Sequence, residues 1–257
     1  GPELCGKSLG VIGLGAIGVE VANAAYGLGM EVCGTDPYLS TLNALALSPH
    51  IKVVATREEI YKTADFITIH APATSDTKGM INKDTIAQMK DGVVIINDSR
   101  GELVNTDDII AALESGKVGR YITDFPNAKL IGVKNCICVP HLGASTPEAE
   151  DNCAVMAAHQ LVDYIENGNI ANSVNYPSVS LARDEGKGRI QILHRNVKNI
   201  ITKFTLAISE QALNIAHMAS SSRGEYACSI LEIDGAVPDK TIESIKKVEG
   251  VLRVRSL

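Results

Sequence analysis

The chain has 257 residues, of which 45% are hydrophobic, and a formal net charge of −6. This length suffices for two domains with cores of their own. Acidic and basic residues are interleaved, which argues against nucleic acid or an anionic membrane as a general partner. No apolar run is long enough to cross a bilayer and no basic-then-apolar leader is present, so we expect neither a spanning nor a secreted protein. The six cysteines lack the spacing of a zinc site or a disulfide scaffold, which predicts no metal and a reduced, cytoplasmic setting.

A glycine-rich turn follows the first apolar run. Leu9 to Ile12 predicts a buried strand, and Ala16 to about Tyr26 predicts a helix. Between them Gly13, Gly15 and Gly18 have the spacing G-x-G-x-x-G. The first glycine makes a tight turn, the second lets a pyrophosphate approach the backbone, and the third allows close packing of helix and strand. The free N–H groups at the helix N-terminus then bind the phosphates.

An aspartate ends the next predicted strand. Glu31 to Thr35 forms that strand and Asp36 follows it, about 20 residues beyond the glycines. A carboxylate at this place binds the adenosine ribose hydroxyls of a dinucleotide and repels a 2′-phosphate. The sequence therefore predicts NAD rather than NADP. The alternative is an ordinary strand–turn–helix with a surface aspartate.

Strands and helices alternate closely through the first two thirds of the chain. The further predicted strands are 51–54, 65–70, 92–97, 118–124 and 136–139, and the predicted helices are 57–62, 83–90, 105–116 and 147–167. Thr56 and Asn105 are expected to cap two of these helices, and Gly116 and Gly168 are expected to end two. This alternation predicts an α/β fold with a doubly wound parallel sheet.

Ligands of such sheets bind outside the carboxyl ends of the strands. Arg100 follows one strand end, where a guanidinium can hold a carboxylate by two parallel hydrogen bonds; the alternative is a surface salt bridge. His141 follows the last strand, and imidazole titrates near neutrality, which suits the removal of a hydroxyl proton as hydride leaves the same carbon. His70 is predicted to line the cleft. The remaining histidines His50, His159 and His217 are predicted to be structural.

The last third of the chain has a different pattern. Residues 1–177 are predicted to form the first domain, 178–188 a linker, and 189–257 a second domain. The second domain is expected to have strands at 189–194, 213–219, 226–234 and 251–255, with helices at 196–209 and 238–247. This strand-helix-strand-strand-helix-strand order is typical of ferredoxin-like α+β domains. It contains no glycine-rich loop or acid–base cluster, so we expect no catalysis there. The helix at 147–167 has an apolar stripe, which we interpret as core or dimer surface.

Four motifs occur in a single order along the first domain. They are the glycine turn, Thr74 to Asn82, Ser99 to Asn105, and Pro140 to Thr146. Over residues 4–177 they resemble the D-isomer-specific 2-hydroxyacid dehydrogenases. The resemblance implies a Rossmann-type domain that binds NAD, with Arg100 orienting the substrate and His141 as acid–base. The cofactor-binding residues that it implies are Gly13, Gly15, Ala16, Ile17, Gly18, Asp36, Pro72, Thr77, Ser99, Asp124, His141 and Gly143.

The tail resembles the ACT domain, a small effector-binding module. His194, Asn196 and Asn214 match the positions where such domains bind L-serine as an effector, and the resemblance implies a homodimer or homotetramer with the three side chains meeting across a paired interface. Lys198-Asn199 departs from the Pro-Gly that is usual there, and the alternative interpretation makes the three residues turn and capping groups. With this tail the implied activity is NAD-dependent oxidation of 3-phosphoglycerate to 3-phosphohydroxypyruvate, in serine synthesis.

Two departures from the family pattern affect the predicted chemistry. Ala128 stands where a glutamate partner of the catalytic histidine is expected, so either another acid such as Glu102 serves or His141 works unassisted. The substrate domain that precedes the first nucleotide-binding strand in the family is absent, so we expect this chain alone to be inactive or impaired. The alternatives are a dehydrogenase of another D-2-hydroxy acid, and a non-catalytic module that binds NAD and an amino acid.

Overall fold

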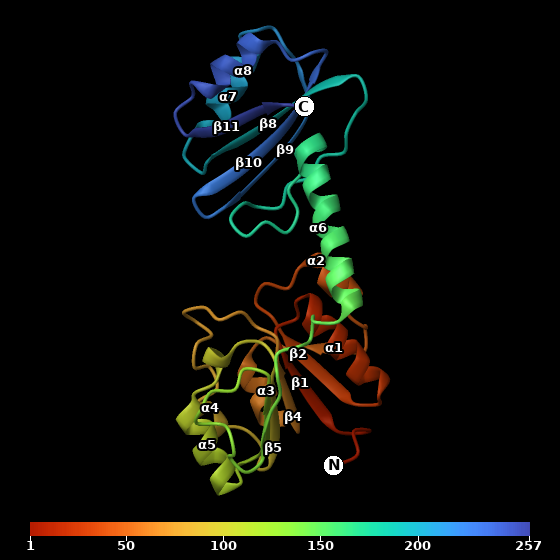
Figure 1. Cartoon of the computed structure of the whole chain (residues 1–257), viewed down its shortest axis with the longest axis vertical. Helices are drawn as coiled ribbons and strands as arrows, with labels where there is room; N and C mark the ends of the chain where they lie inside the picture. Colours follow the sequence, from red (N-terminus) through yellow and green to blue (C-terminus); the bar gives the residue numbers. More distant parts are fainter. The chain divides into compact units, whose positions relative to one another are not determined.

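The apolar run at the start of the chain forms the middle of a seven-stranded parallel sheet (Figure 1). The computed structural model describes all 257 residues. The strands are β1 (Ser8–Ile12), β2 (Glu31–Thr35), β3 (Lys52–Val53), β4 (Phe66–Ile69), β5 (Val93–Asn97), β6 (Val118–Thr123) and β7 (Cys136–Cys138). Their order is β3-β2-β1-β4-β5-β6-β7, so the chain leaves β1 in one direction and later returns to its other side. This is the doubly wound Rossmann-type topology that the strand–helix alternation predicts.

Helices cover both faces of this sheet. They are α1 (Ala16–Gly27), α2 (Thr41–Ala46), α3 (Arg57–Thr63), α4 (Lys83–Ile86) and α5 (Thr106–Ser115), with a 3₁₀ turn η1 (Gly101–Leu103). Apolar residues of α1 pack with Leu9 and Val11 on one face. Ile60, Ile86 and Ile109, which lie on α3, α4 and α5, form the core of the other face. Burial on both faces explains why the strands are almost wholly apolar.

The predicted helix ends are mostly correct. Asn105 accepts hydrogen bonds from the N–H groups of two first-turn residues of α5, and Gly116 ends that helix in the left-handed conformation with φ 79°. Thr56 occupies the N-cap of α3, but its side chain makes no capping hydrogen bond, contrary to the prediction. Helix α4 is shorter than the predicted 83–90, because the N–H groups of Gln88 and Met89 bond three residues back and tighten the chain into turns.

A second sheet forms from the last third of the chain. Its strands are β8 (Lys187–Arg195), β9 (Ile215–Arg223), β10 (Tyr226–Asp234) and β11 (Val251–Ser256), in the antiparallel order β11-β8-β10-β9. Helices α7 (Ile200–Ser209) and α8 (Asp239–Lys246) lie together on one face (Figure 1), over Ile190, Ile192 and Leu231. This is the ferredoxin-like arrangement that the element order predicts.

Two elements of this sheet differ from their predicted limits. Strand β9 continues through Ser220 to Arg223, where a loop is predicted, because Ser220 pairs with Ser229 of β10 and their hydroxyls hydrogen-bond at 2.8 Å. Helix α7 begins at Ile200 rather than at residue 196. Asn199 precedes it in the left-handed region with φ 63°, which a helix cannot continue through.

The chain divides into two units, Gly1–Gly143 and Ala144–Leu257. The boundary predicted from the sequence lies later, at residue 177, and the long helix α6 (Pro147–Asn167) groups with the second unit. Residues predicted as a linker partly pack within that unit, where Val179 is buried and pairs with Ile170. Gly168 ends α6, as predicted, and the Thr146 side chain caps its start. No residue of α6 is buried, although Tyr164 is partly buried and packs against the core of the second unit. None of the helices combines the length and apolarity needed to cross a membrane.

Asp65, which directly precedes β4, is hydrogen-bonded to the start of β1. We expect its replacement to destabilise the first unit at neutral pH. Its carboxylate accepts from the Ser8 backbone at 3.0 Å and from Lys90 at 2.9 Å, which lowers its pKa from 3.8 to about 2. Because the folded pKa is depressed, this stabilisation is present above pH 3.8 and is lost as pH falls through about 2. Urea melts of Asp65→Asn should therefore show a deficit at pH 7 that closes on acidification. Asp91→Asn, at an exposed ion pair, is the control and should change little. A pH-independent Asp65→Asn deficit would contradict this account.

Candidate active site

The glycine turn lies at the point where the strand order reverses, between β1 and β4. A Cβ added to Gly18 would collide with the carbonyl oxygen of Gly13, and one added to Gly13 would lie 2.5 Å from the carbonyl oxygen of His70. Gly13 also has a φ of 97°. A Cβ on Gly15 would meet no heavy atom within 4 Å. Gly13 and Gly18 are therefore required by packing, whereas Gly15 leaves an open approach to the backbone.

The N-terminus of α1 fits the pyrophosphate of a dinucleotide. Gly15 is its N-cap and supplies no side-chain acceptor, and the first internal bond runs from the N–H of Val19 to the Gly15 carbonyl. The N–H groups of Ala16, Ile17 and Gly18 thus have no carbonyl partner within the helix. The Ile17 side chain is 70% exposed, which is unusual for this residue type and leaves it available to cover a ligand.

Substitution can distinguish the packing role of Gly18 from the cofactor-binding role expected of Gly15. Gly15→Ala should keep the melting temperature of the wild type but weaken NADH binding by at least about tenfold, since its methyl group occupies the open approach. Gly18→Ala should instead lower the melting temperature, because the clash is with backbone. Thermal melts and calorimetric titration with NADH measure both. Unchanged NADH affinity in Gly15→Ala would remove this turn from the cofactor site.

Asp36 is held at the end of β2 beside the turn. One carboxylate oxygen accepts from the Leu14 N–H at 2.9 Å and the other from the Tyr38 N–H at 2.8 Å. A fixed carboxylate here suits two ribose hydroxyls and opposes a phosphate. We therefore expect NADH to bind at least about tenfold more tightly than NADPH. Asp36→Asn should reduce this difference between the two dissociation constants. Equal affinities for the two dinucleotides in calorimetry would refute this preference.

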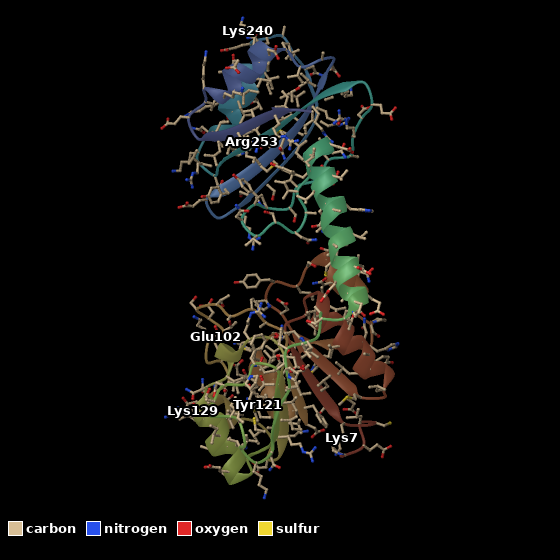
Figure 2. All side chains as sticks on the ribbon, viewed as in Figure 1. Lys7, Glu102, Tyr121, Lys129, Lys240 and Arg253 are labelled. Carbon is tan, nitrogen blue, oxygen red and sulfur yellow. The ribbon has the colours of Figure 1, made fainter.

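Asp124 and His141 form a pair at the adjoining strand ends. The Nδ1 atom of His141 lies 2.5 Å from Oδ2 of Asp124, which follows β6. The Asp124 side chain is 11% exposed, while that of His141 is 55% exposed. Asp124 was expected only near the cofactor; its pairing with His141 replaces the missing glutamate at Ala128. Glu102 lies on η1 (Figure 2), where it is exposed. The carboxylate that pairs with His141 is that of Asp124, so the Glu102 alternative is wrong.

An aromatic ring connects the two predicted catalytic residues. The ring centroid of Phe125 lies 4.5 Å from the ring centroid of His141. The guanidinium carbon of Arg100 lies 5.6 Å from the Phe125 ring centroid. Arg100 also donates to the Ser99 carbonyl at 2.7 Å, and the buried Asn97 side chain donates to the Arg100 carbonyl at 2.9 Å. The structure thus brings Arg100 and His141 to one place. Sequence reasoning missed Phe125 and Asn97, although each adjoins a predicted strand end.

Two carboxyl groups, those of Asp98 and Asp124, lie close to the His141 imidazole. Burial, followed by the neighbouring Asp124 carboxylate, raises the pKa of Asp98 above its ordinary value. The Oδ1 atom of Asp124 is buried without a hydrogen-bond donor. A buried free acceptor fits an amide donor of a bound nicotinamide ring.

The remaining predicted cofactor residues line the same strand ends. Thr77 donates to the Pro72 carbonyl at 2.6 Å and shapes the loop after β4, and Ser99 donates to the Ile69 carbonyl at 2.5 Å. Gly143 is exposed at the end of the first unit. His70 is half-buried, and burial lowers its pKa. Its Cβ lies near Gly18, consistent with a cleft wall.

The predicted effector residues do not come together in one chain. His194 is 2% exposed, and its ring nitrogens lie 3.0 Å from the Ser229 hydroxyl and 2.9 Å from the Arg195 carbonyl oxygen. Asn196 bonds the Gly224 carbonyl, and Asn214 bonds Asp234. His194 pairs with one end of β10, whereas β9 begins next to Asn214 at the other end. Within one copy these side chains therefore lie at opposite ends of the sheet.

Known proteins share both the sequence and the fold. Residues 1–143 match the family described as D-isomer specific 2-hydroxyacid dehydrogenase, NAD binding domain. A D-3-phosphoglycerate dehydrogenase of Haemophilus influenzae is 34% identical over 99% of this chain and 64% of its own length. A glyoxylate reductase from Paecilomyes thermophila superposes with a TM-score of 0.60 at 30% identity, covering 68% of this chain and 54% of its own. The apo D-lactate dehydrogenase from Escherichia coli has a TM-score of 0.56 at 30% identity, covering 65% and 53%.

The chain spans 53% to 64% of the length of the curated relatives that it matches. The family match covers more than half of the chain and includes the glycine turn, Arg100 and His141. The first unit is thus an NAD-binding domain, and the chain belongs to the D-isomer specific 2-hydroxyacid dehydrogenase family.

Proposed function

We propose that these 257 residues serve NAD-dependent oxidation of 3-phosphoglycerate to 3-phosphohydroxypyruvate. The observation that carries this proposal is the extent of the similarity. The curated D-3-phosphoglycerate dehydrogenases align over 90% to 99% of the chain, second unit included. The D-lactate dehydrogenase and glyoxylate reductase structures cover only 65% and 68% of it. The second unit therefore favours the phosphorylated substrate over another D-2-hydroxy acid.

Arg100 and His141 have different roles toward the substrate. Arg100 presents a planar guanidinium, exposed beside Phe125, which suits a carboxylate held by two parallel hydrogen bonds. The same group polarises the carbonyl that develops next to the carboxylate. Asn97 and Ser99 hold the arginine turn in place through the bonds described above. NAD, when bound, supplies the hydride acceptor.

His141 takes the hydroxyl proton in this proposal. Asp124 accepts from Nδ1–H, which places the free lone pair on Nε2, the atom that can face the substrate. Once Nε2 is protonated, the imidazolium is stabilised by the Asp124 carboxylate at 2.5 Å. In the reverse direction the same nitrogen returns the proton to the carbonyl oxygen. Asp124 is then a positioning residue, because it acts through His141.

The substrate is tested by NADH formation in a protein that contains these residues. We expect kcat/KM for 3-phosphoglycerate to exceed that for D-lactate and D-2-hydroxyisocaproate by at least about 100-fold, since a site built for a charged group discriminates strongly against substrates that lack it. A preference for an unphosphorylated acid would refute 3-phosphoglycerate as the substrate, but it would agree with the assignment to the D-2-hydroxyacid dehydrogenase family. Turnover of none of them, with NADH bound, would favour the alternative of a binding module.

A second proposal concerns regulation by L-serine. Asn196 and Asn214 are exposed polar groups at opposite ends of the second sheet, so they would meet only if two copies paired. His194 is buried and hydrogen-bonded within its own sheet, so it would position the strand end instead of contacting the ligand. Calorimetric titration with L-serine and D-serine tests this, with Asn214→Ala as the variant. Saturable, L-selective binding that Asn214→Ala abolishes supports an effector site; no heat at millimolar serine would refute it.

A further inference from the structure

Three side chains form a row across one face of the second sheet. Arg189 of β8 pairs with Glu232 of β10, and Glu232 pairs with His217 of β9. The pairing of β9 with β10 shifts register directly beside this pair, between Glu232 and Ile233. Such irregularities re-aim side chains and recur next to functional sites. His217 lies on an edge strand and is exposed.

The middle residue of the row is a buried carboxylate with an unused oxygen. The Glu232 side chain is 1% exposed. Its Oε1 accepts from the Asp184 N–H at 2.9 Å and lies 3.5 Å from Nε of Arg189, while Oε2 has no hydrogen-bond partner. A buried anionic oxygen without a partner is costly, so a cation or an ordered water is expected to meet it.

Asp184 completes a cluster of three metal-binding side chains. It comes from the segment that precedes β8, whereas His217 and Glu232 come from neighbouring strands. One ligand atom from each of the three lies within 4.8 Å of the others. Imidazole nitrogen with two carboxylate oxygens is a donor set that zinc accepts, and three protein ligands leave one position for water.

We propose that Asp184, His217 and Glu232 form a zinc site that fastens the segment before β8 to the edge of the second sheet. The sequence predicted no metal, because these residues lie far apart along the chain and only the strand pairing assembles them. This inference goes beyond the proposed dehydrogenase activity and does not depend on it.

The surrounding charges permit a divalent ion. Lys187 lies 3.8 Å from Asp184, but its closer partner is Asp234 at 2.7 Å. Arg189 donates from Nη2 to the Leu181 carbonyl at 2.5 Å, and its Nε lies 3.5 Å from Oε1 of Glu232. Its Nε and Nη1 atoms are nevertheless buried without a hydrogen-bond partner and leave Oε2 of Glu232 unmatched. The three carboxylates of Asp184, Glu232 and Asp234 outnumber these two cations by one charge. The cluster is therefore acidic, which favours a bound cation.

The test is calorimetric titration of the 257-residue chain with zinc chloride. The exposed thiols of Cys5 and Cys153 are first replaced by serine, because thiolates also bind zinc. We expect one equivalent to bind, the melting temperature to rise with zinc, and the His217 ring resonances to shift in NMR spectra. Removing a ligand should weaken zinc binding by at least about tenfold, since even the loss of a residue that only orients a metal ligand lowers metal affinity by about 10- to 100-fold.

His217→Ala is the main variant, because its side chain is exposed and its loss should leave the fold intact. Asp184→Asn keeps the shape of a second ligand. His159→Ala, which removes an exposed imidazole on α6, is the matched control and should bind zinc like the parent. Equal zinc affinity in His217→Ala and the parent would overturn the proposal. So would the absence of any heat or His217 shift, which would leave water as the partner of Glu232.

Discussion

Asp124→Asn should lower kcat for the dehydrogenase reaction by about 100- to 10,000-fold, because without this carboxylate His141 can no longer act as the general base, whose contribution is of that size. The carboxylate accepts from Nδ1 of His141 at 2.5 Å and fixes which ring nitrogen is free. An amide can instead donate to Nδ1, which leaves the proton on the wrong nitrogen, and it no longer stabilises the imidazolium. Initial rates of NADH formation with 3-phosphoglycerate measure the loss.

The control for this variant is Glu102→Gln, which removes the other acid that the sequence suggested. Because Glu102 is exposed and does not pair with His141, its replacement should leave kcat close to the wild type. His141→Ala should abolish turnover, and the double variant His141→Ala with Asp124→Asn should be no slower, because the two residues act as a unit. Additive losses, or full activity in Asp124→Asn with its pH profile unchanged, would show that Asp124 does not act through His141.

Arg100→Lys should reduce kcat/KM by at least about 100-fold. Lysine keeps the charge but is a point donor, so it cannot hold a carboxylate by two parallel bonds while polarising the neighbouring carbonyl. The stacking of the guanidinium against Phe125, at 5.6 Å, is also lost. Most of the loss should appear in KM if Arg100 mainly binds the carboxylate, and in kcat if it mainly stabilises the developing carbonyl.

Arg120→Lys is the matched control for the arginine variant. Arg120 lies on β6 and is exposed, so the substitution preserves charge at a position without a predicted role. It should retain the wild-type kcat/KM. If Arg100→Lys retained it as well, Arg100 would be removed from the substrate site.

Features that depend on local sequence could be predicted from the sequence. The glycine turn, the Asn105 cap and the ends of α6 follow from residue types within a few positions of each other. The parallel sheet could be predicted from the alternation of strands and helices along the chain. Helix α2 was missed, because its six residues are too few for a helical periodicity to be recognised.

Features that depend on pairing between distant segments could not be predicted. The family pattern placed the histidine's acid at Ala128, but the structure supplies Asp124, because the strand ends bring β6 and the segment after β7 together. His194 looked like a free strand-end side chain, yet it is buried and hydrogen-bonded to Ser229 on the neighbouring strand. The cluster of Asp184, His217 and Glu232 likewise exists only through strand register.

We propose hydride transfer from a D-2-hydroxy acid to NAD, with His141 taking the proton. Isotope labelling can follow this hydride. A protein containing these residues is given NAD and 3-phosphoglycerate deuterated at the carbon that bears the oxidised hydroxyl, and the NADH is weighed by mass spectrometry. We expect one deuterium per NADH formed, and no NADH in His141→Ala. Deuterium released to water, or unlabelled NADH, would contradict it.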